Sequence, residues 1–238
     1  MREVSDMTSS LAGSREPMGT HLTIDHLVYA TPDLGQSVRH VEELLGVAPV
    51  PGGAHLGWGT YNALVGLGGS TYLEVIGPDP AQPEPAAPRP FGIDHLDEPR
   101  LVAWCASSRR PLVDVLALAR ESGFDPGAIV SMSRQRPDGV VLEWSLTVAA
   151  QANDPANFLP FFIDWGHSVH PSTGLPVAGL LVDLEIFHPE PRTIDLMLSA
   201  VSDDMTLGDE PARIVVHFAD RPALAARVQT AHGVVVLD

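Results

Sequence analysis

The sequence contains a single cysteine, Cys105, and fewer than half as many basic residues as acidic ones. One cysteine excludes an intrachain disulfide and fits a reducing, cytoplasmic compartment. The chain has 14 lysines and arginines against 30 aspartates and glutamates, which gives a formal net charge of −16. Because phosphate binding needs clustered positive charge, this balance argues against nucleic acid and anionic membranes as partners. A small molecule or another protein remains as the partner to expect.

Long apolar runs and targeting signals are also missing. No stretch approaches the roughly 18 apolar residues that a membrane-spanning helix requires. Residues 1–20 are polar and contain acids, so they lack the basic and apolar regions of a signal peptide. We interpret them as a disordered N-terminal tail or a cloning remnant, and we expect a cytoplasmic protein. No phosphate-binding loop, dinucleotide fingerprint or Ser-His-Asp order appears either.

What is present is ordinary globular chemistry, with 45% hydrophobic and 18% charged residues over 238 positions. A chain of this length can bury a substantial core, as one large domain or as two to three small modules. The alternation of side chains along residues 21–31 predicts a strand. The apolar residues of 34–45 have helical spacing, and Gly46 ends the predicted helix. The expected faces of the strand carry Ile24, His26, Val28 and Ala30 on one side and Thr23, Asp25, Leu27 and Tyr29 on the other.

The rest of the first module follows this helix. Residues 49–58 are Gly-rich and irregular, whereas residues 60–67 and 71–76 predict two strands joined by a Gly68-Gly69 turn. Residues 21–78 therefore predict a β-α-β-β-β module. A Pro-rich linker at 79–99 is expected to run extended over the surface.

The same pattern returns after the linker, which makes the chain an internal repeat. Residues 100–166 predict a second β-α-β-β-β module, and residues 177–238 a third, partial module on the same fold. Its expected second helix, 221–230, would bury Leu224, Ala225 and Val228. Each module alone exposes one sheet face, so the modules are expected to pair into an α+β protein with a curved mixed sheet around a cleft. The other expected elements are strands 101–106, 128–133, 140–148, 159–165, 177–187, 214–218 and 234–237, and helices 111–121 and 191–200.

The repeat, together with residues 24–29 (Ile-Asp-His-Leu-Val-Tyr) and 72–76 (Tyr-Leu-Glu-Val-Ile), resembles the vicinal oxygen chelate superfamily. More narrowly, the chain looks like its glyoxalase-like branch, within a wider group of bleomycin-resistance proteins and dioxygenases. The stretches 57–62, 136–144 and 160–166 support this resemblance. It covers residues 21–188 well and the C-terminal part loosely.

The resemblance implies a divalent metal ion cupped by two modules, with ligands from the first and fourth strand of each. Carried over by position, the metal ligands are His26, Glu74 and Asp164. The first strand of the second module has Ala103 where a fourth ligand would stand, and replacements for it are available in His55, His167 or His170. In a more modest interpretation, His26 is a structural strand histidine whose ring hydrogen-bonds to the backbone or to a tyrosine. Against it, Glu74 is an acid in an apolar strand, where an unpaired charge is costly.

Other residues suggest contacts to an organic ligand. Trp58 would supply an apolar wall and Asn62 a polar anchor, although their segment can equally be a bulge entering a strand. Arg134 and Arg136 are cations in a very acidic chain and suit a carboxylate or phosphate, while residues 137–139 fit a simple β-turn. Trp144 is assigned to the same substrate-binding set. Cys105 is expected to be a buried packing residue with no histidine nearby.

These features predict a glyoxalase-like protein that binds a small organic molecule in a cleft. As an enzyme it would use Glu74 to move a proton, and the resemblance implies metal-assisted lyase, isomerase or dioxygenase chemistry. The alternative is a metal-free protein that binds or sequesters a small molecule, as resistance members of the superfamily do. The resemblance implies a homodimer as the expected assembly, while the residues themselves leave the oligomeric state open.

Overall fold

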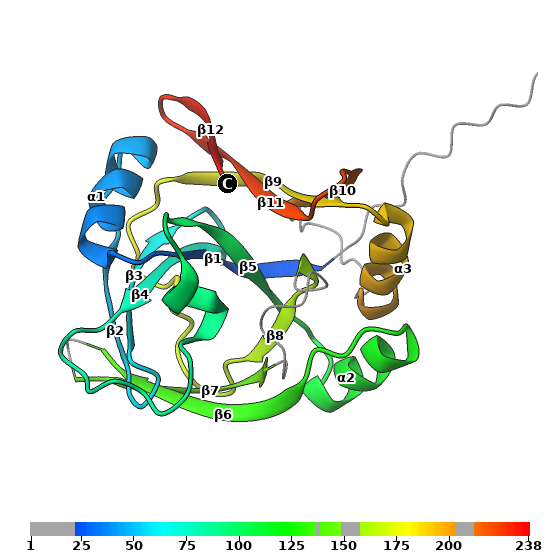
Figure 1. The fold of residues 1–238 in the computed structure, drawn as a ribbon, viewed down its shortest axis with the longest axis horizontal. Coiled ribbons are helices and arrows are strands. Elements are labelled where there is room, and N and C mark those ends of the chain that lie inside the picture. The colour runs from blue at the N-terminus through cyan, green and yellow to red at the C-terminus, as the bar shows by residue number, and fades with distance from the viewer. Residues whose placement is uncertain (1–21, 137–138, 149–157, 203–211) are drawn as a thin grey trace, which may run out of the picture.

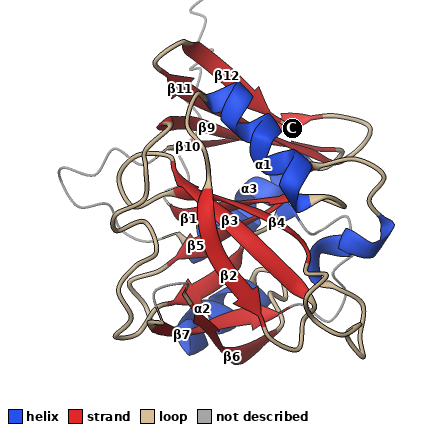
Figure 2. Ribbon diagram, turned by 90° about the vertical axis from the view of Figure 1, so that its left-hand side faces the viewer, coloured by secondary structure: helices blue, strands red, loops and turns tan. Residues whose placement is uncertain are grey.

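The computed structural model describes residues 22–136, 139–148, 158–202 and 212–238 of the chain (Figure 1). The expected tail at 1–20 lies outside this range, as do two residues of the turn predicted at 137–139. A barrel and a smaller sheet lie one above the other in Figure 2. The barrel half contains β1 (Thr23–Ala30), α1 (Leu34–Leu45), β2 (Val50–His55), β3 (Thr60–Gly66), β4 (Tyr72–Pro78), η1 (Pro90–His95), β5 (Arg100–Ser107), α2 (Leu112–Glu121), β6 (Ala128–Gln135), β7 (Val141–Val148) and β8 (Phe161–Asp164).

Eight strands close the barrel in the order β1-β4-β3-β2-β6-β7-β8-β5. Each half of this order is one β-α-β-β-β module, and the two halves repeat the same internal arrangement. The modules meet along the antiparallel pair β1–β5 and where Ala54 of β2 pairs with Gln135 of β6. The predicted α+β fold of paired modules is confirmed.

Helix α1 begins and ends where the sequence predicts. The Asp33 side chain accepts a hydrogen bond from the backbone N–H of Gln36 at 2.9 Å, which caps the first turn. Gly46 adopts a left-handed conformation at φ 77°, and its N–H bonds to the carbonyl of Glu42. The helix buries Ser37, Val41 and Leu45, one residue per turn, and this face lies against β3 and β4.

Two segments of the barrel half differ from the sequence-based expectation. Residues 50–55, expected to be irregular, form strand β2, which pairs with β3 across a register shift between Pro51 and Gly53. The glycines hide the apolar alternation on which the strand prediction depends. The Pro-rich linker does not run only over the surface, because η1 lies within it and Pro90 and Phe91 line the cavity described below.

The smaller sheet contains the C-terminal part of the chain. Its strands follow the order β10-β9-β11-β12, with β10 parallel to β9 and β11 antiparallel to it. The helix expected at 221–230 is wrong, because this segment is strand β11. From Ala226 onward it alternates with period two, burying Ala226 and Val228 and exposing Arg227 and Gln229, while Leu224 and Ala225 are both buried. The elements are β9 (Gly179–His188), α3 (Pro191–Val201), β10 (Arg213–Phe218), β11 (Ala223–Thr230) and β12 (Gly233–Leu237).

One apolar core joins the two sheets. Leu27 and Leu73 of the barrel share a buried cluster with Leu184 and Val228 of the smaller sheet and with Leu198 of α3. Helices α2 and α3 lie side by side at one flank of the molecule (Figure 1). Among the described residues, no helix has the length and apolar character needed to span a membrane.

Candidate functional site

A cavity of about 1220 Å³ opens among the barrel strands. Both modules contribute to its wall: the polar side comes from the first module and from Arg134 of the second, and the apolar side comes mainly from the second module. Its volume lies slightly above the upper end of the range of about 300–1,000 Å³ that is typical of small-molecule sites. The polar side carries His26, His55, Asn62, Glu74 and Arg134, and the apolar side carries Met132, Leu146, Phe161 and Ile163.

His26 lies on β1 and is 4% exposed, with its ring stacked on Tyr72 at a centroid distance of 4.8 Å. Its Nδ1 atom lies 2.7 Å from Oδ1 of the neighbouring Asp25. Since a carboxylate only accepts, Nδ1 carries the hydrogen of this bond, and the neutral ring then presents an unprotonated Nε2. That atom faces Oε2 of Glu74 across 3.7 Å. This separation is too long for a hydrogen bond, so both atoms are available to a ligand.

A β-bulge allows the side chain of Asp25 to contact the ring of His26, the next residue in the sequence. The register between β1 and β5 shifts between Ile24 and His26, which leaves Asp25 as the extra residue. The strict alternation expected from the sequence is therefore wrong here: Ile24 joins the main core with Leu27, and Asp25 is buried beside His26. An aspartate next to a histidine inside an apolar strand is the sequence signal that points to such a pair.

Rings from two segments surround the Asp25 carboxylate. Its Oδ2 accepts hydrogen bonds from Nε1 of Trp165 at 3.1 Å and from Nε2 of His170 at 3.0 Å. Burial raises the pKa of Asp25, but the hydrogen bonds from His170 and His26 outweigh it and hold the pKa well below its usual range. Asp25 is therefore a carboxylate at neutral pH and keeps the His26 ring in one orientation.

Glu74 lies on β4 with 8% of its surface exposed. Its Oε1 accepts a hydrogen bond from Nδ2 of Asn62, and Nε2 of His55 lies 3.9 Å from the same oxygen. The His55 ring is fixed by Thr60 Oγ1 at 3.0 Å. Burial lowers the pKa of His55, more than the nearby Glu74 raises it, so this imidazole is neutral near pH 7. Each oxygen of Glu74 thus faces a different imidazole.

Arg134, on β6, brings a positive charge to the same wall. Its Nη1 donates to Oδ1 of Asn62 at 2.9 Å, so Asn62 bridges the guanidinium and the Glu74 carboxylate. Burial lowers the pKa of Arg134, and the negative charge of Glu74 raises it in part. Charged groups of both signs therefore meet in one buried network.

The other predicted ligand contacts separate into two groups. Trp58, Asn62 and Trp144 line the cavity together with Arg134, whereas Arg136 is not among the lining residues.

Asp164, the third predicted metal ligand, does not join His26 and Glu74. It is exposed at the end of β8 and accepts a hydrogen bond from the N–H of Gly166, while its strand neighbours Ile163 and Trp165 line the cavity. Alternation along the strand places Asp164 on the outer face.

The metal expected from the resemblance requires about three protein ligands at one point. His26 Nε2 and Glu74 Oε2 face each other, but His55 lies on the other oxygen of Glu74 and Ala103 stands opposite. Arg134 also places a cation beside this carboxylate, where a second positive charge would be repelled. The cavity-facing residues therefore supply two convergent ligands and do not fit a resident divalent ion in this arrangement.

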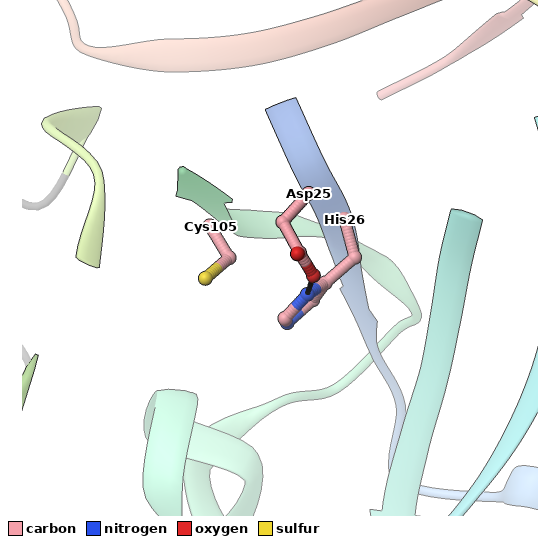
Figure 3. Close-up of side chains that lie close together, drawn as sticks. All are labelled: Asp25, His26 and Cys105. Atoms are coloured by element: carbon pink, nitrogen blue, oxygen red, sulfur yellow. Dashed lines mark hydrogen bonds and ion pairs between the residues drawn. The ribbon is translucent and has the colours of Figure 1, made fainter. Parts of the chain in front are cut away.

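A second cluster contains His26 itself together with Asp25 and Cys105 (Figure 3). Ligand atoms of Asp25, His26 and Cys105 lie within 4.8 Å of one another, so the expectation that Cys105 has no histidine nearby is wrong. Cys105 is the register partner of His26 on β5 and is fully buried. Burial raises the pKa of this thiol and so disfavours the thiolate, which is the form that binds a metal ion. Since Asp25 and His26 Nδ1 already bond each other, the cluster is better explained as support for the His26 ring.

The remaining predicted substitutes for the absent ligand lie elsewhere. His167 is exposed, and His170 bonds to Asp25 and to Oγ of Ser172 without lining the cavity. His55 does line it. The sequence offered His55, His167 and His170 as replacements for the absent ligand, and in the structure His55 lies beside Glu74 and His170 hydrogen-bonds to Asp25.

Comparison with known proteins agrees with this architecture. No curated protein sequence matches the chain. A crystal structure of a hypothetical protein from Staphylococcus aureus has a TM-score of 0.61 and 14% identity, covering 88% of this chain and 92% of that one. Methylmalonyl-CoA epimerase from Streptomyces coelicolor has a TM-score of 0.41 and 18% identity, covering 63% and 99%. The epimerase from Mycobacterium tuberculosis has a TM-score of 0.39 and 15% identity, covering 63% and 92%.

Only the first of these three structures exceeds a TM-score of 0.5, and at 14% identity it shows a shared fold alone. The sequence family gives the more specific result. A family model described as "Glyoxalase-like domain" matches residues 24–202, which is well over half of the chain. The match spans the barrel, helix α3 and the strand between them, and it includes every residue of the polar wall. The chain therefore belongs to the Glyoxalase-like domain family.

Proposed function

We propose that this protein is an enzyme that binds a small organic molecule in the barrel cavity and moves a proton on it, as a lyase or isomerase. The observation that carries the proposal is the facing pair His26 Nε2 and Glu74 Oε2, 3.7 Å apart in a buried wall. Each side chain is held through its other polar atom, His26 by Asp25 and Glu74 by Asn62. Positioned groups of this kind are what general acid–base catalysis requires.

The proposed reaction begins at a C–H bond next to a carbonyl group of the ligand. Glu74 Oε2 takes the proton, the C–H electron pair forms an enolate, and the negative charge moves to the carbonyl oxygen. Returning a proton to a different atom completes an isomerisation, and loss of a leaving group from the enolate completes an elimination. His26 is the second proton-transfer group, because its Nε2 faces Glu74 and Asp25 stabilises the ring when it is protonated.

No step of this proposal passes through a metal ion, because the two cavity-facing ligands do not form a complete set. The guanidinium of Arg134, which Asn62 links to Glu74, supplies the positive potential for developing negative charge. Trp58 and Trp144 remain proposed ligand contacts from their place in the cavity wall. Arg136 has no such place and is not part of the proposed site.

Hydrogen–deuterium exchange tests this function with simple carbonyl compounds in place of the natural substrate. Phenylpyruvate and 4-phenyl-2-butanone are incubated with the protein in D₂O, and loss of the C–H signals next to the carbonyl is followed by proton NMR. We expect the wild type to accelerate exchange and Glu74→Gln to reduce that acceleration by about 10²-fold or more, as loss of a positioned base does. Asp164→Asn is the matched control, because it neutralises an exposed carboxylate outside the cavity.

The same assay decides the role of a metal. Exchange that persists in EDTA supports the metal-free proposal, whereas full loss in EDTA with recovery on adding a divalent ion contradicts it. Equal exchange rates in wild type and Glu74→Gln would remove Glu74 from the mechanism.

Sequestration of a ligand without chemistry is the second candidate. The apolar side of the cavity favours it, since Ala103, Phe161 and Ile163 line the cavity and none of them can transfer a proton or bind a metal ion. A protein of this kind would bind the same carbonyl compounds in the cavity. It would leave their exchange rates at the buffer value in both wild type and Glu74→Gln.

A further inference from the structure

Two hydrogen-bond donors in the cavity wall have no partner among the described residues. They are Nε of Arg134 and Nε1 of Trp144, and both atoms are buried. Their side chains are 5% and 8% exposed and both line the cavity. A buried donor without a partner costs about 1–3 kcal/mol. Two such donors in one wall indicate a bound group that satisfies them.

Arg134 differs from several other arginines of this acidic chain. Arg89, Arg120 and Arg213 each have a carboxylate oxygen within 4 Å, whereas no described carboxylate comes that close to Arg134. Its one hydrogen bond to a described residue leaves from Nη1 to the amide oxygen of Asn62. No described residue hydrogen-bonds to the edge of the guanidinium that carries Nε, and such an edge binds a planar carboxylate through two parallel hydrogen bonds.

Trp144 places its donor in the same region of the barrel. It lies on β7, where its register partner is Met132, two residues before Arg134 on β6. Its ring packs against Trp165 at a centroid distance of 5.3 Å, within an apolar cluster that includes Leu142 and Ile163. A ligand that reaches both donors therefore has its remaining atoms among aromatic and aliphatic side chains.

We propose that Arg134 and Trp144 form a subsite for the carboxylate of an apolar, preferably aromatic, monocarboxylic acid. The inference rests on the proposed binding of a small molecule in this cavity and names its chemical class. It does not depend on proton transfer, because binding alone satisfies the two donors.

The charge of the site favours a carboxylate over a phosphate. One guanidinium compensates a single negative charge, while Glu74 lies one residue away through Asn62 and repels further negative charge. A planar monoanion also matches the shape of the guanidinium edge at Nε better than a tetrahedral dianion. Because Asn62 hydrogen-bonds to both Arg134 and Glu74, we expect the carbon atoms next to the bound carboxylate to lie on the side of the cavity that carries Glu74.

Calorimetry with a matched pair of probes tests the subsite. 3-Phenylpropionate and 3-phenylpropanamide have the same size and differ in the carboxylate, and phenyl phosphate serves as the third probe. We expect the wild-type protein to bind the acid about 10- to 100-fold more tightly than the amide, as expected for a charge-assisted hydrogen bond. Arg134→Gln should remove this preference, whereas Arg120→Gln, at an exposed arginine, should keep it.

Trp144→Phe tests the second donor without removing the aromatic ring, and it keeps the proposal testable if Arg134→Gln fails to fold. It should weaken binding of the acid about 2- to 10-fold, the size of one hydrogen bond, and leave binding of the amide less affected. Glu74→Gln should bind the acid at least as tightly as the wild type, since it removes a repelling charge. Failure of proton transfer is thereby distinguished from failure of the subsite.

Several results would overturn the proposal. Equal affinity of acid and amide in the wild type would do so, as would a preference that survives Arg134→Gln. Tighter binding of phenyl phosphate would exclude the carboxylate class. Absence of binding by all three probes at millimolar concentration would also count against it.

Discussion

At the residue scale, the burial of Asp25 is compensated by hydrogen bonds from three rings. His26, Trp165 and His170 all donate to this carboxylate, which is 2% exposed. A buried acid without such donors would be protonated or would destabilise the fold. Asp25 thus links the first strand of one module to the loop that follows the last strand of the other, and it orients the ring of the proposed acid–base residue His26.

The lowered pKa of Asp25 predicts a dependence of stability on pH. Because its pKa is lower in the folded than in the unfolded state, the unfolded state binds more protons in acid, and stability falls as pH falls. The contribution of Asp25 is complete above its unfolded pKa of about 4 and declines below it. We expect Asp25→Asn to lower the free energy of unfolding by about 1–3 kcal/mol at pH 7 and by less near pH 3.

Denaturant unfolding followed by tryptophan fluorescence between pH 3 and pH 7 measures this effect. Asp164→Asn, at an exposed carboxylate, is the control and should change stability little at any pH. A loss of stability in Asp25→Asn that is the same at pH 3 and pH 7 would contradict the argument.

At the scale of elements, strand β2 brings its backbone unusually close to the polar network. A Cβ atom added to Gly52 would overlap Oδ1 of Asn62 and lie 2.7 Å from Nη1 of Arg134. Glycine at this position therefore leaves the space in which the Asn62–Arg134 hydrogen bond forms. The shift in register between Pro51 and Gly53 places the bulged backbone against this bond.

Gly52→Ala should therefore disturb the hydrogen bond between Asn62 and Arg134, because the added methyl group occupies its space. We expect it to displace Asn62 or Arg134, to lower the free energy of unfolding by about 1–3 kcal/mol through overpacking, and to reduce the preference for 3-phenylpropionate over its amide. Gly35→Ala is the control, because a Cβ there meets ordinary contacts of 3.5 Å or more at the start of α1. Calorimetry and thermal unfolding of both variants provide the measurement, and unchanged discrimination in Gly52→Ala would refute the expected displacement.

At the scale of the whole molecule, the barrel and the smaller sheet share one apolar core. Leu184 of β9 is fully buried in the same cluster as Leu73 and Trp104 of the barrel. Strand β9 also follows the barrel closely in space, since the N–H of Leu181 bonds to the carbonyl of Leu67. Neither sheet can lose its packing without exposing the apolar face of the other.

This shared core predicts that the two sheets unfold together. Leu184→Ala should lower the free energy of unfolding by about 2–5 kcal/mol, the usual range for a buried leucine. The four tryptophans all lie in residues 58–165 of the barrel half, so their fluorescence reports on the barrel alone. We expect the fluorescence and far-ultraviolet circular dichroism transitions of Leu184→Ala to shift together.

Leu180→Ala, at a leucine that is 57% exposed on the same strand, should shift both transitions much less. A tryptophan transition that stays at its wild-type position in Leu184→Ala would show that the smaller sheet unfolds independently of the barrel.

The sequence alone determined the features that depend on neighbouring residues. The cap at Asp33, the stop at Gly46 and the short apolar runs that form β1, β3 and β4 are local, so the repeated module could be predicted. The same reasoning missed β11, where small and branched residues suit both helix and strand, and pairing with β9 decided between them.

For the candidate site, the sequence determined that His26 and Glu74 would share one wall, because both occupy apolar strands of one module. Only the tertiary structure decided what surrounds them. The bulge at Asp25, the outward turn of Asp164 and the meeting of Arg134 with Asn62 each depend on strand register and barrel closure between segments far apart in the chain. A one-residue change of register moves a side chain to the opposite face, and no local pattern specifies that change.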